Sequence, residues 1–239
     1  MASTLRYSDI MNLVQRHVLR NVEDSMAANI VSAGMNMIWQ AYDWRESLAD
    51  ITPFYLIPGR QDYPSDIITI PEDIHGLKQV FLVRLNGEEV YKQPLSVLRQ
   101  VERTNFQTLP NTISYMTTLT NDKSGYRVHP RPATNYGAPY YLIEGTYKKR
   151  SPSVDAAGLN DVIPFDDQYQ GVLYSVFVYW GKYLMGSQDV EQAANLAVMN
   201  INTMANNEGL NDGELHFAPR LPLVGGYGNA FGLNNLYGY

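Results

Sequence analysis

The sequence predicts an α+β protein: a four-helix bundle made from N- and C-terminal helix pairs, with an inserted antiparallel β sheet or barrel domain and an extended C-terminal tail. Apolar residues recur at helical spacing near both ends of the chain, over residues 7–42 and 169–205. Between these regions, prolines and short β-branched runs argue against long helices. The last residues, 221–239, contain no charged side chain and follow neither a helical nor a strand period.

Two helices are expected at the N-terminus. Residues 7–20 carry an apolar stripe that recurs every three or four positions, and Ser8 is a plausible N-cap. A second helix is expected from about residue 23 to residue 42, with Ile30 and Ile38 facing inward. Each helix therefore presents an apolar stripe that needs a packing partner.

The central residues are expected to form short antiparallel strands. The clearest signal is a hairpin with strands over 79–85 and 88–92, which turns at Asn86-Gly87. This dipeptide accepts the positive φ angles that a tight hairpin turn requires. A second hairpin and a further strand follow, and one short helix is expected to begin at Pro94 between the two hairpins.

The helical period returns near the C-terminus. Apolar residues from Tyr169 to Leu184 keep helical spacing, and the preceding "PFDD" suits a helix start. A last helix is expected, marked by apolar residues at helical spacing from Val190 to Ala205, with Ser187 as its N-cap. Packing the first helix pair against the last pair is the simplest way to bury all these stripes. The expected domains are residues 1–46 (N-terminal half of the bundle), 47–150 (inserted β domain), 151–213 (C-terminal half of the bundle) and 214–239 (docking tail).

Composition and motifs argue against several functions. The chain has no cysteine, which excludes disulfides and thiolate zinc sites. It has no apolar run of about 18 residues that could span a membrane, and its start does not resemble a signal peptide. The histidines lack metal-site spacing, and neither a P-loop nor a nucleophile elbow is present. The acid pairs Asp166-Asp167 and Glu88-Glu89 fit a helix start and a hairpin. We therefore expect no catalytic residue, no metal ligand and no cofactor.

The tail combines glycines with large apolar side chains. A free, disordered end is normally polar, whereas aromatic and aliphatic anchors are typical of residues that dock on a partner. The glycines would let the backbone lie close to another surface. We expect the tail to dock on a partner, although an end without a role is the alternative. The expected anchors are Leu221, Leu223, Tyr227, Phe231, Leu233, Leu236, Tyr237 and Tyr239.

One basic cluster could contact DNA or a partner. If the strands that carry them pair, the following residues, with His129, would share one edge or end of the sheet: Arg127, Arg131, Lys148, Lys149 and Arg150. Phosphate contacts are one interpretation. A solvated strand end, or salt bridges to an acidic partner, is the other. The net charge of −6 is unlike that of a free-standing nucleic-acid binder, whose affinity comes from neutralising phosphates.

Five segments, in order, resemble the head-to-tail adaptor proteins of short-tailed bacteriophages, which are also called connector or tail tubular proteins. The resemblance covers about residues 29–202, and its motifs are specific through their order and spacing. The segments are "MNMIWQAYDWRES", "YLIPGRQDYPSDIITIPEDI", "YRVHPRPA", "YYLIEGTYKKRSPSV" and "DVIPFDDQYQGVLYSVFVYWGKYLMGSQDVEQAANLAVMNIN".

The resemblance implies a structural virion protein of the neck, assembled in the host cytoplasm. It implies a homo-oligomeric ring, dodecameric in relatives, with the portal protein above and nozzle or tail proteins below. Double-stranded DNA would pass through its channel without specific binding, and no membrane would be involved. The tail is not a shared motif of this family. The alternatives are another ring or tube component of the tail, a DNA-binding module that uses the basic cluster, and an enzyme of unknown type.

Overall fold

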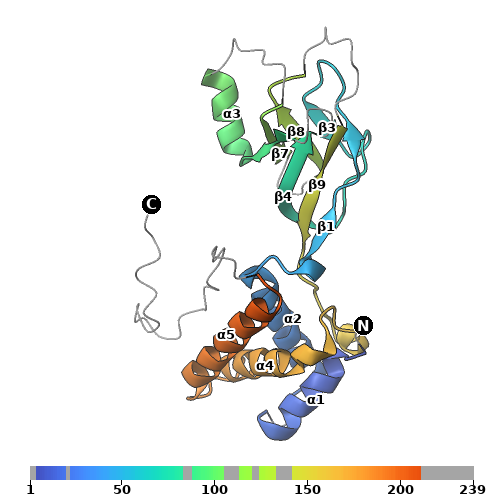
Figure 1. Ribbon diagram of the computed structural model, residues 1–239. Coiled ribbons are helices and arrows are strands. Elements are labelled where there is room, and N and C mark those ends of the chain that lie inside the picture. The colour runs from blue at the N-terminus through green and yellow to red at the C-terminus, as the bar shows by residue number, and fades with distance from the viewer. Residues whose placement is uncertain are drawn as a thin grey trace. The chain divides into compact units, whose positions relative to one another are not determined.

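The computed structural model divides the chain into two compact units. The helical unit comprises Met1–Trp44 with Ser151–Tyr239, and the β unit comprises Arg45–Arg150 (Figure 1). The described residues are 4–19, 22–82, 88–104, 113–119, 124–132 and 142–210. The predicted tail residues 221–239 and the predicted turn at Asn86-Gly87 lie outside them.

The helical unit packs four long helices around one apolar core. In its described part these are α1 (Tyr7–His17), α2 (Asp24–Ala41), α4 (Gln170–Leu184) and α5 (Val190–Asn207), with the short 3-10 helices η3 (Gly158–Asn160) and η4 (Asp167–Tyr169). Helix α4 contacts each of α1, α2 and α5, and α5 packs chiefly on α4. The mixed helix and sheet class is thus confirmed. The regular four-helix bundle stays a prediction, because the packing observed is centred on α4.

Two of the predicted helix caps are wrong. Helix α1 begins one residue before Ser8, and the Asp9 carboxylate accepts the backbone N–H of the N-cap Arg6 at 2.9 Å. Helix α5 is preceded by Asp189 rather than by Ser187. In both places the helix starts at a position other than the one that the cap preference of serine indicates, so a single capping residue did not define the boundary.

The acid pair before α4 stabilises a helix start, as its sequence context indicates. The Asp166 carboxylate accepts the backbone N–H of Gln168 at 3.0 Å, which caps η4. The Asp167 carboxylate accepts the backbone N–H groups of Thr4 and Leu5 at 3.0 and 3.1 Å. The second carboxylate therefore fastens the start of the described chain to the C-terminal half of the helical unit.

A buried aromatic cluster joins the two halves of the helical unit. Trp44 is fully buried, and its indole N–H donates to the carbonyl of Ile38 at 2.5 Å. The Trp44 ring meets those of Tyr42 and Phe165 edge-on, with centroids 5.3 and 5.8 Å apart. Phe165 also contacts Trp39 at 5.9 Å. Edge-to-face pairs of this kind add to the free energy gained by burying the rings.

The described residues of the β unit form two sheets and one helix. The first sheet has the order β1-β9-β4-β5, with β2 also on β9, and the second has the order β3-β8-β7-β6. The first sheet contains β1 (Leu48–Asp50), β2 (Phe54–Tyr55), β4 (Ile74–Leu82), β5 (Glu88–Glu89) and β9 (Leu142–Lys149). The second contains β3 (Asp62–Pro64), β6 (Tyr91–Lys92), β7 (Tyr115–Thr118) and β8 (Gly125–His129), and the helix is α3 (Leu95–Thr104).

One apolar core lies between these two sheets. It takes Phe54, Val80 and Ile143 from the first sheet and Tyr63 and Tyr126 from the second. The ring of Phe54 stacks on that of Tyr126, with centroids 5.8 Å apart. The two sheets therefore pack on each other around one shared core and form a single folded unit.

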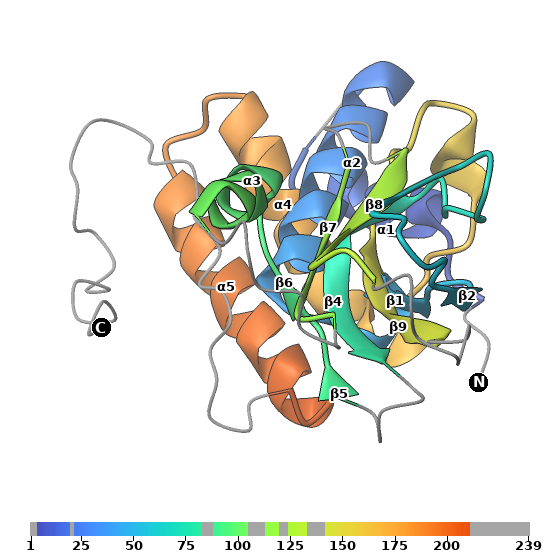
Figure 2. The ribbon, with the colours of Figure 1, turned by 90° about the horizontal axis from the view of Figure 1, so that it is seen from above.

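Strand pairing follows the predicted hairpins with one exception. Strands β4 and β5 pair antiparallel, as do β7 and β8. The helix expected at Pro94 is present as α3. Strands β6 and β7, however, pair parallel, whereas the sequence suggested an antiparallel sheet. The reason is topological, because the chain passes through α3 between them, and a crossover that contains a helix returns the chain in the same direction. Figure 2 shows α3 beside β6 and β7.

Two glycines give a paired test of this fold. A Cβ at Gly145 would lie 2.1 Å from the backbone oxygen of Gln79, in the irregular register of β4 with β9. Because backbone cannot move aside as a side chain can, Gly145→Ala should lower the free energy of unfolding by about 1–3 kcal/mol. A Cβ at Gly171, near the start of α4, would meet no other described residue within 4 Å apart from its chain neighbours and the backbone of its own helix.

Gly171→Ala should therefore raise the free energy of unfolding by roughly 0.5–1 kcal/mol, because alanine loses less backbone entropy in a helix. Urea denaturation followed by circular dichroism measures both effects. Equal midpoints for the two variants would contradict the close approach of β4 and β9.

Candidate functional site

The strands that carry the predicted basic cluster do not pair with each other. Arg127 lies on β8 in the second sheet, whereas Lys148 and Lys149 lie on β9 in the first. The neighbours of β8 are β3 and β7, and those of β9 are β1, β2 and β4. The strand pairing on which the expected basic cluster rested is therefore wrong, because other strands occupy both sides of each of these two.

Arg127 is held by carboxylates within the β unit. Its guanidinium donates to both carboxylate oxygens of Glu102 on α3 at 2.9 Å and to Asp62 Oδ1 on β3 at 2.6 Å. The hydrogen bonds to Glu102 are the main cause of a raised pKa for Arg127. Its side chain is only 20% exposed. A bidentate pair of this kind fixes geometry as well as charge, so Arg127 joins α3 to the second sheet rather than presenting a free positive charge.

The other residues of the predicted cluster differ in how far they are exposed. Lys148 is buried, with 6% exposure, whereas Arg150 is exposed and its Nε donates to the carbonyl of Ile74 at 3.3 Å. Burial lowers the pKa of His129, against the opposing effect of Glu102. His129 therefore adds little positive charge at neutral pH, and Lys149 is half-buried on β9.

The loop that carries the exposed Arg131 lies beside a second loop, and the sequence alone did not predict this contact. Arg131 lies between Pro130 and Pro132, and the Pro132 carbonyl accepts the backbone N–H of Gly59 at 2.7 Å. Gly59 has φ +75°, a conformation that favours glycine. This contact joins the loop of Arg131 to the turn that contains Arg60, which is also exposed. The Pro-Gly-Arg sequence predicts the turn, but only the fold brings the two loops together.

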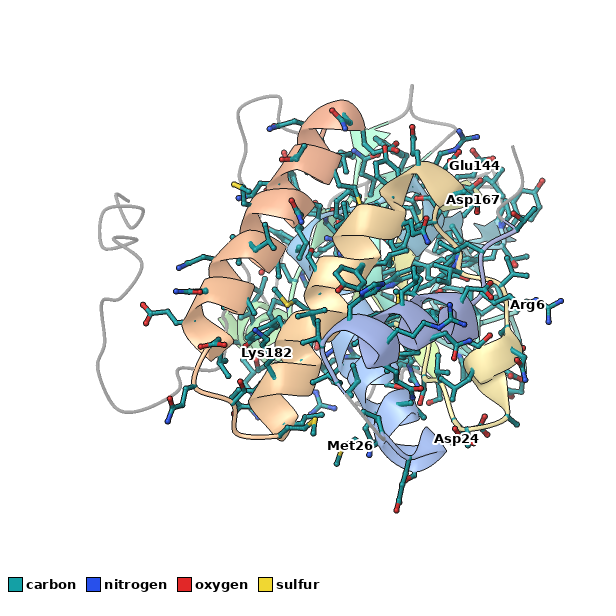
Figure 3. The ribbon with its side chains drawn as sticks, turned by 90° about the horizontal axis from the view of Figure 1, so that it is seen from below. Arg6, Asp24, Met26, Glu144, Asp167 and Lys182 are labelled. Carbon is teal, nitrogen blue, oxygen red and sulfur yellow. The ribbon has the colours of Figure 1, made fainter. Side chains whose placement is uncertain are left out.

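Three of the four long helices, α2, α4 and α5, are nearly free of charge. Helices α2, α4 and α5 contain only Asp24, Lys182 and Glu191 as charged residues, each within a first or last turn. Figure 3 labels Asp24 and Met26 at the start of α2 and Lys182 on α4. On α5, Leu196 is 48% and Met199 is 59% exposed. A solvent-facing helix surface normally carries charged residues, whereas depletion of charge and enrichment of methionine are typical of protein interfaces.

Among the residues that the structure describes, no group of three or more His, Cys, Asp or Glu side chains is placed so that it could hold a metal ion. Within the same residues, no helix combines the length and apolarity that a membrane crossing requires. The most distinctive surface of the described residues is the uncharged surface of α2, α4 and α5 on the helical unit. The predicted docking tail lies outside the described residues.

The role assigned to Arg127 can be tested against a matched arginine. Arg127→Met leaves Glu102 and Asp62 without their shared partner, which should lower the free energy of unfolding by roughly 1–3 kcal/mol. Arg131→Met removes the same charge from an exposed loop and should change it by less than about 0.5 kcal/mol. Chemical denaturation of both full-length variants measures the difference. Equal losses would contradict a structural role for Arg127.

Comparison with known proteins identifies the family. The model of the SU10 adaptor protein family matches residues 5–213, which include both units. No curated protein matches the sequence significantly. This is a family of phage head-to-tail adaptors, and the match agrees with the resemblance found in the sequence. The chain belongs to the SU10 adaptor protein family.

Proposed function

We propose that this protein is the head-to-tail adaptor of a short-tailed phage. In this proposal identical copies form a ring, a dodecamer as in relatives, that joins the portal protein above to nozzle or tail proteins below. Double-stranded DNA passes through its channel without specific binding, and the ring forms part of the virion neck after assembly in the host cytoplasm. The observation that carries the proposal is the family match, which runs from before α1 to beyond the end of α5.

The charge distribution supports a channel component over a DNA-binding module. A net charge of −6 disfavours adhesion of DNA, because like charges repel. Arg127, which a DNA-binding module would need, is already paired with Glu102 and Asp62. Arg131 and Arg150 stay candidates for contact with DNA or an acidic partner. In this proposal the four helices are the bundle expected from the sequence, and the β unit is its inserted domain.

A second candidate is another ring or tube component of the same tail, such as a nozzle or minor tail protein. The uncharged helix faces would suit this role equally well, since any ring needs contacts between copies. Only the identity of the neighbour separates it from an adaptor. A portal partner supports the adaptor, and a partner found only among tail proteins supports the alternative.

Sedimentation with purified portal tests the proposal. The full-length chain, mixed with portal rings from the same particle, should sediment with them at a fixed ratio of several copies per ring. A chain that sediments as a free monomer would contradict it. DNA binding separates the remaining rival: the adaptor should bind duplex DNA weakly, whereas a DNA-binding module should bind tightly at low salt and lose affinity steeply as salt rises.

The docking role of the tail leads to a separate prediction. Deleting residues 221–239 should leave the thermal unfolding midpoint unchanged, because the tail lies outside every periodic segment. The deletion should weaken binding to the portal, to the nozzle or between copies, as measured by sedimentation.

Matched substitutions keep the length of the tail constant. Replacing Phe231 and Leu236 by serine should weaken binding as the deletion does, since large apolar anchors carry most binding energy. Replacing Asn229 and Asn234 by serine should not. If the truncated chain unfolds, the tail is part of the fold rather than a docking segment. If both pairs of substitutions have the same effect on binding, the apolar side chains are not the anchors.

A further inference from the structure

Two helices of the helical unit each present an uncharged outer stripe. On α5 the stripe repeats at helical spacing from the first turn to the last, and it contains Gln192, Asn195, Leu196, Met199, Thr203 and Asn206. On α2 it contains Ser25, Met26, Asn29, Asn36 and Gln40. All of these residues are exposed, and none carries a charge. We call the first set the α5 stripe and the second the α2 stripe.

The chemistry of the stripes favours a second copy of this chain as the partner. Each copy has a net charge of −6, so copies repel one another, and a contact through surfaces that carry no charge adds no further repulsion. An amide group both donates and accepts hydrogen bonds. A surface of Asn, Gln and Thr can therefore pair with another surface of the same kind, which two acidic surfaces cannot do. A basic or acidic partner would gain nothing electrostatically from such a face.

The placement of the stripes favours a contact between unlike surfaces. Both α2 and α5 pack on α4, and they make few contacts with each other. Each stripe therefore lies on a helix of its own, and Figures 1 and 3 show both helices in the same unit as α4. When one surface of a copy binds a different surface of the next, the contact is heterologous, and its repetition builds a ring if the rotation closes.

We propose that the α5 stripe of one copy packs against the α2 stripe of the next copy. Leu196 and Met199 supply the apolar centre from α5, and Met26 supplies apolar area from α2, where it is 38% exposed. The amides around them form the polar rim. This inference rests on the ring proposed above, and it adds which surfaces of the chain hold the ring together.

Site-specific cross-linking tests the contact directly. Because the chain has no cysteine, Met199→Cys creates a single attachment point for a benzophenone maleimide. The labelled full-length chain is irradiated alone and after mixing with portal rings, and the cross-linked peptides are identified by mass spectrometry. The proposal expects covalent links between copies that map to α2. Ser96→Cys, on the exposed surface of α3, is the matched control and should give no such link.

A charge placed in the contact gives an independent readout. Met199→Lys should shift the assembled species towards monomer in analytical ultracentrifugation. The reason is that the α2 stripe of the next copy contains no acidic side chain that could pair with the lysine. Met199→Gln keeps the stripe neutral and should leave the assembly intact. Because position 199 is exposed, both variants should keep the fold, and circular dichroism checks that they do.

The outcomes separate this inference from the proposed function. If copies assemble, alone or on the portal, but the links from position 199 map elsewhere or do not form, the contact is wrong while the adaptor ring stands. If the chain neither assembles nor binds portal at any attainable concentration, both proposals fail. Links to α2, together with loss of assembly in Met199→Lys alone, support the contact.

Discussion

The helical unit is discontinuous in sequence, and the contact between its two halves is the constraint on which the rest of the structure depends. Trp44, the last residue before the β unit, is fully buried, and its ring lies 5.8 Å from that of Phe165 in the other half. The Asp167 carboxylate adds hydrogen bonds to Thr4 and Leu5. These contacts close the helical core across an insertion of about a hundred residues, so the core does not depend on the path the chain takes within the insertion.

Charge is used differently in the two units. In the β unit, Arg127 is paired with Glu102 and Asp62, so that opposite charges are satisfied within the fold. In the helical unit, α2, α4 and α5 carry almost no charge. In the ring proposed above, copies of an acidic chain would need surfaces that do not repel, and neutral amides with scattered methionine and leucine would provide them. Association between copies and weak adhesion to DNA would then be compatible in one chain.

The local structure could be predicted from the sequence, whereas the pairing of distant strands could not. The periodicity of residues 169–184 predicts α4, and the acids ahead of it predict the helix start that Asp166 caps. Short-range turn signals likewise predict the pairing of β7 with β8. These features depend on residues close together in the chain. The strand pairing assumed for the basic cluster was wrong because it depended on a long-range choice. The strand that contains Arg127 and the strand that contains Lys148 look suited to pair with each other. Nothing in the local sequence indicates that β3 pairs with the first and β4 with the second.

The uncharged helix faces, by contrast, were present in the sequence and could have been found by asking which amphipathic helices lack charge on the polar side.

Electron microscopy of the purified full-length chain with its portal is the most direct test of the claim that this is an adaptor that builds a ring. Two-dimensional averages should show a ring-shaped tier beneath the portal, with the symmetry of a closed assembly of identical copies. Averages that show the portal alone, with the added chain present only as single particles, would contradict the account.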